Sequence, residues 1–369
     1  METKKLQQIS DFFQPGEIEK YEKSFSRYTR SVFYREYCQL KSFFNRIQQT
    51  LKIVVGNPYL IPHISKNYFD KFFLGKQRLR SLEIAVEYNC NSQCDQCSCR
   101  LAYDPSKERL TMAEFKNIID QARALGAFQF CLTGGEPLLQ LNDTLEIIKY
   151  LRAKKCYVHL CSNGLLMTEE ILKKLKEAGL NSLEMGLDSA VPQVHDDNRR
   201  ETGYAKIMQV IEWARPLKIR IVLNTISTHE KIKNHDLLAL VKLAQAKRVN
   251  LQITPPCVTG AWKNKTEILM DGKEKQYFWW LMKFPRVRTD MYSSLTTVRC
   301  PAAREKIGVQ PYGDVVSCPL IQVVYGNIKN EHLEQIIEKM LKNPFYSKTA
   351  FCLPAFEQEF IEKYLLDKK

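Results

Sequence analysis

The sequence has few glycines and prolines and no long apolar run. Among its 369 residues are 15 Gly and 15 Pro, while 44% are hydrophobic and 26% are charged. This composition excludes a largely disordered or collagen-like chain. No apolar stretch approaches the ~18 residues that cross a bilayer, and the start, Met1 to Lys5 and then mixed polar residues, lacks the apolar core of a secretory signal. We therefore expect a folded, cytoplasmic protein.

Positive charge is in excess and is concentrated near the start. The chain has 55 Lys and Arg against 41 Asp and Glu, a net charge of +14. Residues 1–80 carry fifteen basic and seven acidic residues, a net of +8. Such a balance favours polyanionic partners, either nucleic acid or an anionic membrane surface. By itself the charge does not choose between them, or establish either.

Twelve cysteines are many for a chain without an export signal. In a reducing compartment, clustered thiols hold metals or iron–sulfur clusters more often than they form disulfides. Seven of them fall into two groups: Cys90, Cys94, Cys97 and Cys99 within ten residues, and Cys300, Cys318 and Cys352 spread over the last part. The remaining five are isolated, and we expect them to act as small buried hydrophobes: Cys38, Cys131, Cys156, Cys161 and Cys257.

Short apolar runs alternate with helical periodicity from Leu82 to about Thr254. The expected strands are 82–88, 128–132, 157–161, 182–187, 219–226 and 249–253, and the expected helices are 111–124, 142–153, 169–178, 203–214 and 235–247. Thr111 and Glu114 form a capping box at the first helix. Strands alternating with helices imply a parallel sheet with right-handed crossovers. The fold is α/β, either a doubly wound sheet or, as we favour from the site below, a partial (β/α)6 TIM-like barrel.

The flanking segments differ from this central pattern. From Phe33 to Val54 apolar residues recur at alternating steps of four and three, which predicts one helical stripe. The basic helical segment over residues 24–55 suits contact with an anionic membrane. Packing on the barrel, or closing its bottom, is the more common use of such a stripe. The aromatic run Tyr277 to Trp280 could line an apolar pocket, although such clusters more often belong to a core.

We divide the chain into four parts. They are an N-terminal basic helical region (1–80), the barrel (81–256), a connecting or substrate segment (257–299) and a small C-terminal α+β part (300–369) with strands expected at 306–310 and 313–317.

Three cysteines follow directly on the first expected strand. Cys90, Cys94 and Cys97, spaced four and three apart in a loop, can reach three corners of one cubane cluster and leave its fourth iron open. A zinc site would need a fourth donor, which Cys99 could offer. The spacing alone leaves both metals open.

Polar groups follow the later strands at the same end. Thr133-Gly134-Gly135-Glu136-Pro137 ends the second strand, where glycines allow close backbone approach and a carboxylate can hold an ammonium group. The next three strands end in Ser162-Asn163-Gly164, Asp188-Ser189 and Asn224-Thr225. Each could be an ordinary turn. Five consecutive strands in phase predict a ligand site at the carboxyl edge of a parallel sheet.

With these motifs, residues 82–254 resemble the radical S-adenosylmethionine (SAM) superfamily. The resemblance implies that Cys90, Cys94 and Cys97 bind a 4Fe–4S cluster whose open iron SAM chelates. It also implies that Glu136, with the backbone of Gly134 and Gly135, holds the amino group of SAM. The other residues implied to contact SAM are Pro137, Ser162, Asn163, Asp188, Ser189 and Asn224. Gln96 departs from the family, in which an aromatic residue often precedes the third cysteine. The implied reaction is reductive cleavage of SAM to a 5′-deoxyadenosyl radical that removes hydrogen from a peptide, small metabolite or lipid.

A second resemblance lies in the last part of the chain. The spacing of Cys300, Gly313 and Cys318, with twelve and then four residues between them, resembles the opening of a SPASM or twitch extension. Cys352 follows this stretch. The resemblance implies that these three cysteines hold one auxiliary 4Fe–4S cluster, with either an open iron or a fourth ligand from elsewhere, such as Cys257 or Cys99. The implied electron donor is a one-electron carrier such as flavodoxin or ferredoxin.

A zinc-clamped, non-catalytic nucleic-acid-binding protein is the rival hypothesis, suggested by the charge and the clustered thiols. Against it, the basic residues are dispersed rather than gathered around the thiols, and the sequence shows no named nucleic-acid-binding motif. We therefore do not expect nucleic acid as a partner.

Overall fold

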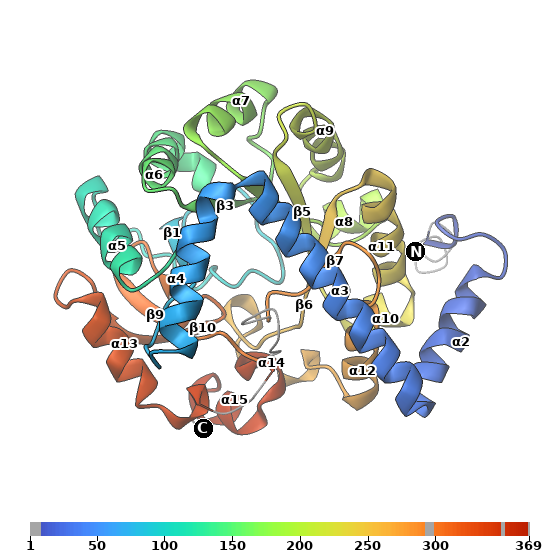
Figure 1. Ribbon diagram of the computed structural model, residues 1–369. Helices are drawn as coiled ribbons and strands as arrows, with labels where there is room; N and C mark the ends of the chain where they lie inside the picture. The colour runs from blue at the N-terminus through green and yellow to red at the C-terminus, as the bar shows by residue number, and fades with distance from the viewer. Residues whose placement is uncertain (1–8, 292–298, 348–350, 368–369) are drawn as a thin grey trace.

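A curled sheet of ten strands forms the centre of the molecule. The computed structural model describes residues 9–291, 299–347 and 351–367. In spatial order the strands are β10-β9-β8-β1-β2-β3-β4-β5-β6-β7. Their bounds are β1 Ser81–Glu87, β2 Gln129–Gly134, β3 Tyr157–Ser162, β4 Ser182–Gly186, β5 Arg220–Ile226, β6 Asn250–Thr254, β7 Val287–Arg288, β8 Lys306–Val309, β9 Asp314–Cys318 and β10 Ile321–Asn327. Figure 1 shows helices outside the curved sheet, so the predicted α/β partial barrel is confirmed.

Helices between the parallel strands cover the outer face of this sheet. They are α5 Met112–Ala124, α6 Leu141–Ala153, α7 Glu169–Ala178, α8 Pro192–Arg199, α9 Tyr204–Ala214, α10 His229–Lys233 and α11 Asp236–Lys247. The predicted capping box is present: the Thr111 side chain accepts from the Glu114 amide, and the Thr111 amide donates to the Glu114 carboxylate at 2.7 Å. A reciprocal cap satisfies two backbone donors that the first helical turn leaves free.

Side chains alternate between the two faces of each barrel strand. On β3, Val158 and Leu160 are fully buried in the main core, whereas His159 and Cys161 line the lumen. On β1, Ile84 lies in the core and Glu83 lines the lumen. Because successive strand residues point to opposite faces, the apolar set packs under the helices and the polar set faces inward. The barrel interior is therefore polar.

Helices that precede the barrel close the amino-terminal ends of its strands. They are α3 Val32–Gly56, η1 Pro58–Leu60 and α4 Ile61–Phe72, whereas α2 Glu17–Arg30 packs against Tyr277 and Trp280. Leu60 forms a small core with Phe128 and Tyr157, which lie at the beginnings of β2 and β3. Closure of the bottom of the barrel, one of the two predicted roles, is what these helices do. The expectation that the apolar stripe faces the core is wrong, because Phe33 and Phe44 on that stripe are exposed.

The chain after the barrel continues the same sheet. β8 pairs in parallel with β1, and β9 and β10 follow as antiparallel strands. The connecting or substrate segment, 257–299, also contains the short parallel strand β7. The remaining helices are α12 Gly272–Leu281, α13 Leu333–Leu341, α14 Leu353–Phe356 and α15 Gln358–Tyr364, with 3-10 turns η2 Pro137–Gln140, η3 Gly260–Trp262, η4 Thr266–Ile268 and η5 Pro344–Tyr346.

The aromatic run on α12 belongs to the core. Phe278 and Trp280 are fully buried, and Phe25 of α2 lies 5.1 Å from Tyr277 and 5.6 Å from Trp280 between ring centroids. None of these four aromatic residues lines the large barrel cavity. Within the described residues, no helix combines the length and apolarity that crossing a bilayer requires.

Candidate active site

The cysteine loop follows β1 and is anchored by the carboxylate at the end of that strand. Glu87 accepts backbone hydrogen bonds from Tyr88 at 2.7 Å and Asn89 at 3.0 Å, and Arg109 lies 3.4 Å from it. The Cys97 amide donates to the Cys94 carbonyl at 3.3 Å, which closes a turn within the loop. These contacts fix both ends of a loop that has little regular structure of its own.

The two glycines after β2 let the turn lie directly against the cysteine loop. The amide of Gly135 donates to the Glu87 carbonyl at 2.6 Å, and that of Glu136 donates to the Asn89 carbonyl at 3.0 Å. A Cβ on Gly135 would overlap the Asn89 carbonyl oxygen, and Gly134 has φ of 132°. Glycine alone tolerates the close backbone approach at position 135 and the positive φ at position 134. The motif therefore joins two loops of the chain, a role that the sequence did not reveal.

Glu136 ties the end of β2 to the end of β3. The carboxylate is fully buried and accepts from the amides of Leu138 at 3.0 Å and Asn163 at 2.7 Å and from the Ser162 hydroxyl at 3.0 Å. Burial raises the pKa of this carboxyl group, while the hydrogen bonds act in the opposite direction. Most of its acceptor sites are thus occupied by the protein, and its contact with an ammonium group stays a prediction.

Asn163 connects β3 to the cysteine loop. Its side-chain amide donates to the Asn91 side chain at 2.7 Å and the Ser92 hydroxyl at 2.9 Å, and it lies 3.9 Å from the Cys90 sulfur. Burial raises the pKa of the Cys90 thiol, and burial likewise raises that of Cys94 to about 11. A positively charged metal in the loop would reverse this preference for the protonated form.

Asp188 at the end of β4 lies in a buried ion pair. Arg199 donates to its two oxygens at 2.8 and 3.3 Å, and Gln96 of the cysteine loop donates to it at 2.7 Å. The Asp188 amide donates to His195 at 3.1 Å. Burial alone would raise the pKa of Asp188, but the Arg199 guanidinium beside it holds that pKa well below its usual range. The Arg199 side chain crosses so close to Gly186 that a Cβ there would overlap it.

Other predicted residues of this edge have protein partners. The buried Ser189 hydroxyl accepts from the Val191 amide at 3.0 Å, and Asn224 donates to Glu184 at 2.6 Å. Pro137 is buried in the first position of η2. The structure thus links the cysteine loop to the ends of β2, β3 and β4, while Asn224 of β5 points to the barrel interior.

Two residues near the loop escaped the sequence analysis. Glu201, between α8 and α9, accepts from the Ser92 hydroxyl through one carboxylate oxygen, and its other oxygen is buried without a partner among the described residues. Gly260 has φ of 56°, and a Cβ there would overlap the carbonyl oxygen of Cys97. No sequence signal showed that Gly260 would touch the loop.

The barrel encloses a cavity of about 580 Å³. At one end it reaches Ser98 and Thr133, beside the cysteine loop, and at the side it reaches Cys318. Charged lining residues include Glu83 paired with Lys306, and Glu184 paired with His159 at 3.1 Å. Cys131, His159 and Cys161 also face this space with ligand atoms within 4.8 Å of one another, a set that could hold one metal ion. The expectation that Cys131 and Cys161 are buried fillers is wrong.

The second group of thiols meets beside β8. The Cys352 thiol hydrogen-bonds to Cys257, which raises the pKa of Cys352 well above its ordinary value. Burial and the neighbouring Cys352 raise the pKa of Cys300 to about 12. Burial also raises the pKa of Cys318 well above its ordinary value. Cys257 is therefore not an isolated filler. Cys99, the other suggested fourth ligand, instead donates to the Gly134 carbonyl at 3.3 Å.

These features define a partial βα barrel with a thiol-bearing ligand site at the carboxyl ends of its strands. Residues 85–244 match the family model of the radical SAM superfamily, so this part of the chain is a radical SAM domain. A PqqA peptide cyclase of Rhizobium meliloti is 25% identical over 282 residues, covering 72% of this chain and 73% of the relative. A probable GTP 3′,8-cyclase of Methanocaldococcus jannaschii is 31% identical over 168 residues, covering 43% and 53% respectively.

Two solved structures share the fold. Streptococcus suis SuiB bound to S-adenosylmethionine superposes with a TM-score of 0.57 at 13% identity, covering 83% of this chain and 77% of that one. The anSMEcpe enzyme with bound AdoMet has a TM-score of 0.56 at 17% identity, covering 78% and 92%. The relatives are enzymes, and the SPASM-like extension after the barrel fits these families.

Proposed function

We propose that this chain is a radical SAM enzyme with a catalytic 4Fe–4S cluster on Cys90, Cys94 and Cys97. Three thiols on one short loop suit a cubane, because they leave one iron for SAM. The residues present fit this group, since the unpartnered oxygen of Glu201 lies beside the loop and can take a donor from SAM. When bound, the cluster supplies one electron that splits SAM into methionine and a 5′-deoxyadenosyl radical, which removes hydrogen from the substrate.

The surrounding residues hold and orient these groups. Asn163 and Gln96 keep the loop in register with the ends of β3 and β4. The proposed SAM contacts remain Gly134, Gly135, Glu136, Pro137, Ser162, Asn163, Asp188, Ser189 and Asn224. The burial of this edge excludes water from the reacting centre, which protects a radical from side reactions.

We propose a peptide side chain as the group that enters the barrel cavity. The similarity to a PqqA peptide cyclase over most of both chains supports this substrate class. A polar lining with paired charges suits a polar or charged side chain. His159, which is hydrogen-bonded to Glu184, lies where it can hold or donate a proton to that group.

The auxiliary cluster is proposed on Cys300, Cys318 and Cys352, with Cys257 as the fourth ligand. The support is the contact between Cys257 and Cys352, together with the burial of Cys257, Cys318 and Cys352 and the half-buried position of Cys300 beside Cys352. Cys318 also lines the cavity, so this cluster would lie beside the substrate. A flavodoxin or ferredoxin is the proposed electron donor to the enzyme.

The single observation that carries the proposal is that the loop of Cys90, Cys94 and Cys97 is hydrogen-bonded to residues at the ends of three neighbouring strands. It is tested by anaerobic iron–sulfur reconstitution, followed by measurement of 5′-deoxyadenosine formed from SAM with a chemical reductant. We expect product from the wild-type chain and none from Cys94→Ala, with Cys156→Ala as the control because that buried thiol lies away from both groups. Colourless protein that binds zinc and refuses iron would contradict the proposal and favour the zinc-clamped nucleic-acid hypothesis.

A further inference from the structure

The helix α3 turns its apolar stripe away from the protein. Phe33, Leu40 and Phe44 are 84%, 52% and 58% exposed, and separations of 7 and 11 residues return to the same side of an α-helix. The opposite side faces the barrel with polar groups. Asn45 donates to the Lys283 and Phe284 carbonyls at 3.0 Å, and Gln49 donates to the Val287 carbonyl at 3.3 Å. This orientation reverses the usual one, in which the apolar face is buried.

The exposed apolar surface continues along α4. Twelve of the eighteen exposed large apolar side chains among the described residues fall between residues 32 and 74. Phe69 and Phe73 stack at 5.2 Å and are 53% and 77% exposed. Figure 1 shows α3 and α4 lying in front of the sheet on one side of the molecule. Concentrated apolar exposure of this kind marks an interaction surface.

Positive charge accompanies this apolar surface. Within residues 32–77 there are seven Lys and Arg but two acids, and one of these, Asp70, is buried and paired with Arg78. Exposed lysines of this stretch are Lys41, Lys52, Lys66 and Lys76. At the end of α4, beside the exposed Phe72, is a pocket of about 230 Å³.

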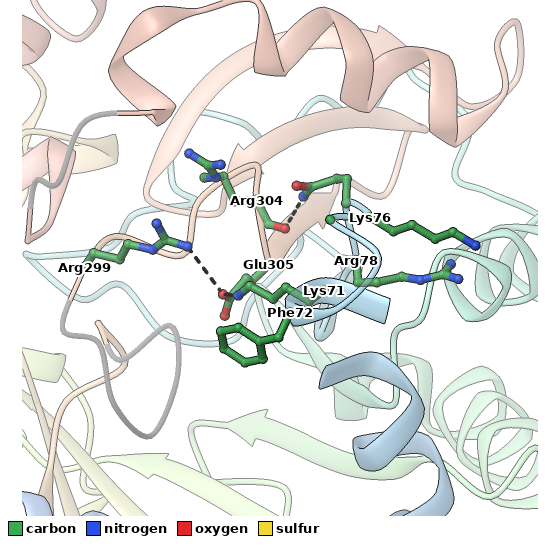
Figure 2. Close-up of a pocket in the computed structure, with 9 residues that line it drawn as sticks. Lys71, Phe72, Lys76, Arg78, Arg299, Arg304 and Glu305 are labelled. Carbon is green, nitrogen blue, oxygen red and sulfur yellow. Dashed lines mark hydrogen bonds and ion pairs between the residues drawn. The ribbon is translucent and has the colours of Figure 1, made fainter. Parts of the chain in front are cut away.

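The lining of this pocket adds further positive charge. Five cationic side chains line it together with the single carboxylate of Glu305: Lys71, Lys76, Arg78, Arg299 and Arg304. Figure 2 shows Lys71 and Arg299 directed to Glu305, while Lys76 and Arg78 extend away from it.

We propose that the outer face of α3 and α4, residues 32–74, docks on an anionic phospholipid membrane. Aromatic and aliphatic side chains on a helix with flanking lysines match the headgroup boundary, where rings enter the apolar layer and ammonium groups reach lipid phosphates. A second copy of this chain is disfavoured as occupant, because self-pairing would bring two positively charged faces together. The surface shares α3 with the segment 24–55 expected from sequence, but it extends over α4 and leaves out α2, which is packed against α12.

The docking surface and the thiol site lie at opposite ends of the barrel. The α3 and α4 side contacts residues at the beginnings of strands, such as Phe128 and Tyr157, whereas the cysteine loop follows the end of β1. Docking would therefore leave the SAM site open to a water-borne reductant. The proposal goes beyond the proposed enzymatic function and does not depend on it.

Vesicle flotation with the full-length reconstituted protein tests the docking. The lipids are phosphatidylcholine alone, or with about one third phosphatidylglycerol as the anionic lipid. We expect wild type to float with anionic vesicles, less so at high salt because salt screens the charges. The variant Phe33→Ser/Phe44→Ser/Phe73→Ser should bind about tenfold or more weakly, and Lys41→Glu/Lys52→Glu should lose the preference for anionic lipid.

Matched controls lie on other faces. Val324→Ser removes an exposed apolar residue on β10, and Lys174→Glu reverses an exposed charge on α7, so both should float as wild type does. Failure of wild type to float, or flotation of the triple Phe variant equal to wild type, would overturn the proposal. So would light scattering that shows a wild-type dimer and a monomeric triple variant without vesicle binding. The triple variant should still cleave SAM without lipid, which separates this test from that of the enzymatic function.

Discussion

The side chain of Gln96 donates to Asp188 at 2.7 Å and thereby joins the cysteine loop to the end of β4. The same carboxylate accepts two hydrogen bonds from Arg199 of α8. The buried Asp188 carboxylate therefore connects the cysteine loop, the end of β4 and α8. Gln96 stands where the resembling family often has an aromatic residue. In this chain the position orients the loop through a polar contact instead.

Substitution of this pair should therefore act through the buried ion pair. Asp188→Asn leaves the Arg199 charge without its anion, and we expect a loss of about 3–5 kcal/mol in the free energy of unfolding. Gln96→Ala removes one hydrogen bond to a charged group, so about 1.5–3 kcal/mol is expected. Urea unfolding of the metal-free protein measures both. Arg200→Gln is the control, because its pair with Asp95 is exposed and should change stability by less than about 1 kcal/mol.

Local sequence patterns predicted the barrel but not the contacts between distant segments. Alternating apolar strands and capped helices, such as the one that begins after Thr111, can be recognised from residues close together in the sequence. Their order predicts a parallel sheet, and a parallel sheet brings the carboxyl ends of its strands to one edge. The approach of Gly260 to Cys97 depends on the path of the chain after β6, which spacing does not encode. The same path brings Cys257 to Cys352, whereas the sequence offered Cys257 only as one of two suggested fourth ligands. Likewise, helical periodicity showed that Phe33 and Phe44 share a face, but not that this face points outward.

Gly260 should be essential for the shape of the cysteine loop. Alanine at this position would place a Cβ on the Cys97 carbonyl and would hold a side-chain residue at φ of 56°. We expect Gly260→Ala to lower iron incorporation at the first site severalfold. Gly272→Ala is the matched control, since nothing lies within 4 Å of its added Cβ. Equal iron content in the two variants would show that the loop can shift without loss of function.

His159 should make stability fall at alkaline pH. Burial alone would lower its pKa, but hydrogen bonds to Cys161 and Glu184 outweigh burial and raise the pKa to about 9. A raised histidine pKa contributes stability that is fully present below the unfolded value of about 6.5. That contribution is lost as pH rises through the folded value.

We therefore expect the free energy of unfolding to decrease between those two pH values by at most about 3 kcal/mol. Denaturant unfolding across this range measures the slope. His159→Gln should flatten it, and Glu184→Gln should reduce it. An unchanged slope in His159→Gln would assign the pH dependence to other groups.

Cys257 should matter for the second iron–sulfur site alone. Its thiol contacts Cys352 and donates to the Pro255 carbonyl at 3.5 Å, so its observed contacts lie outside the loop of Cys90, Cys94 and Cys97. We expect Cys257→Ser to lower total iron to about the content of one cluster, because serine is a poor substitute for a thiolate ligand. SAM cleavage at the first site should persist, without turnover of substrate. Cys38→Ser is the control, since that buried thiol lies on α3 near Lys283 and belongs to neither cysteine group. If Cys257→Ser kept the iron of the wild type while Cys300→Ser lost it, three cysteines would suffice and the fourth iron would be open to substrate.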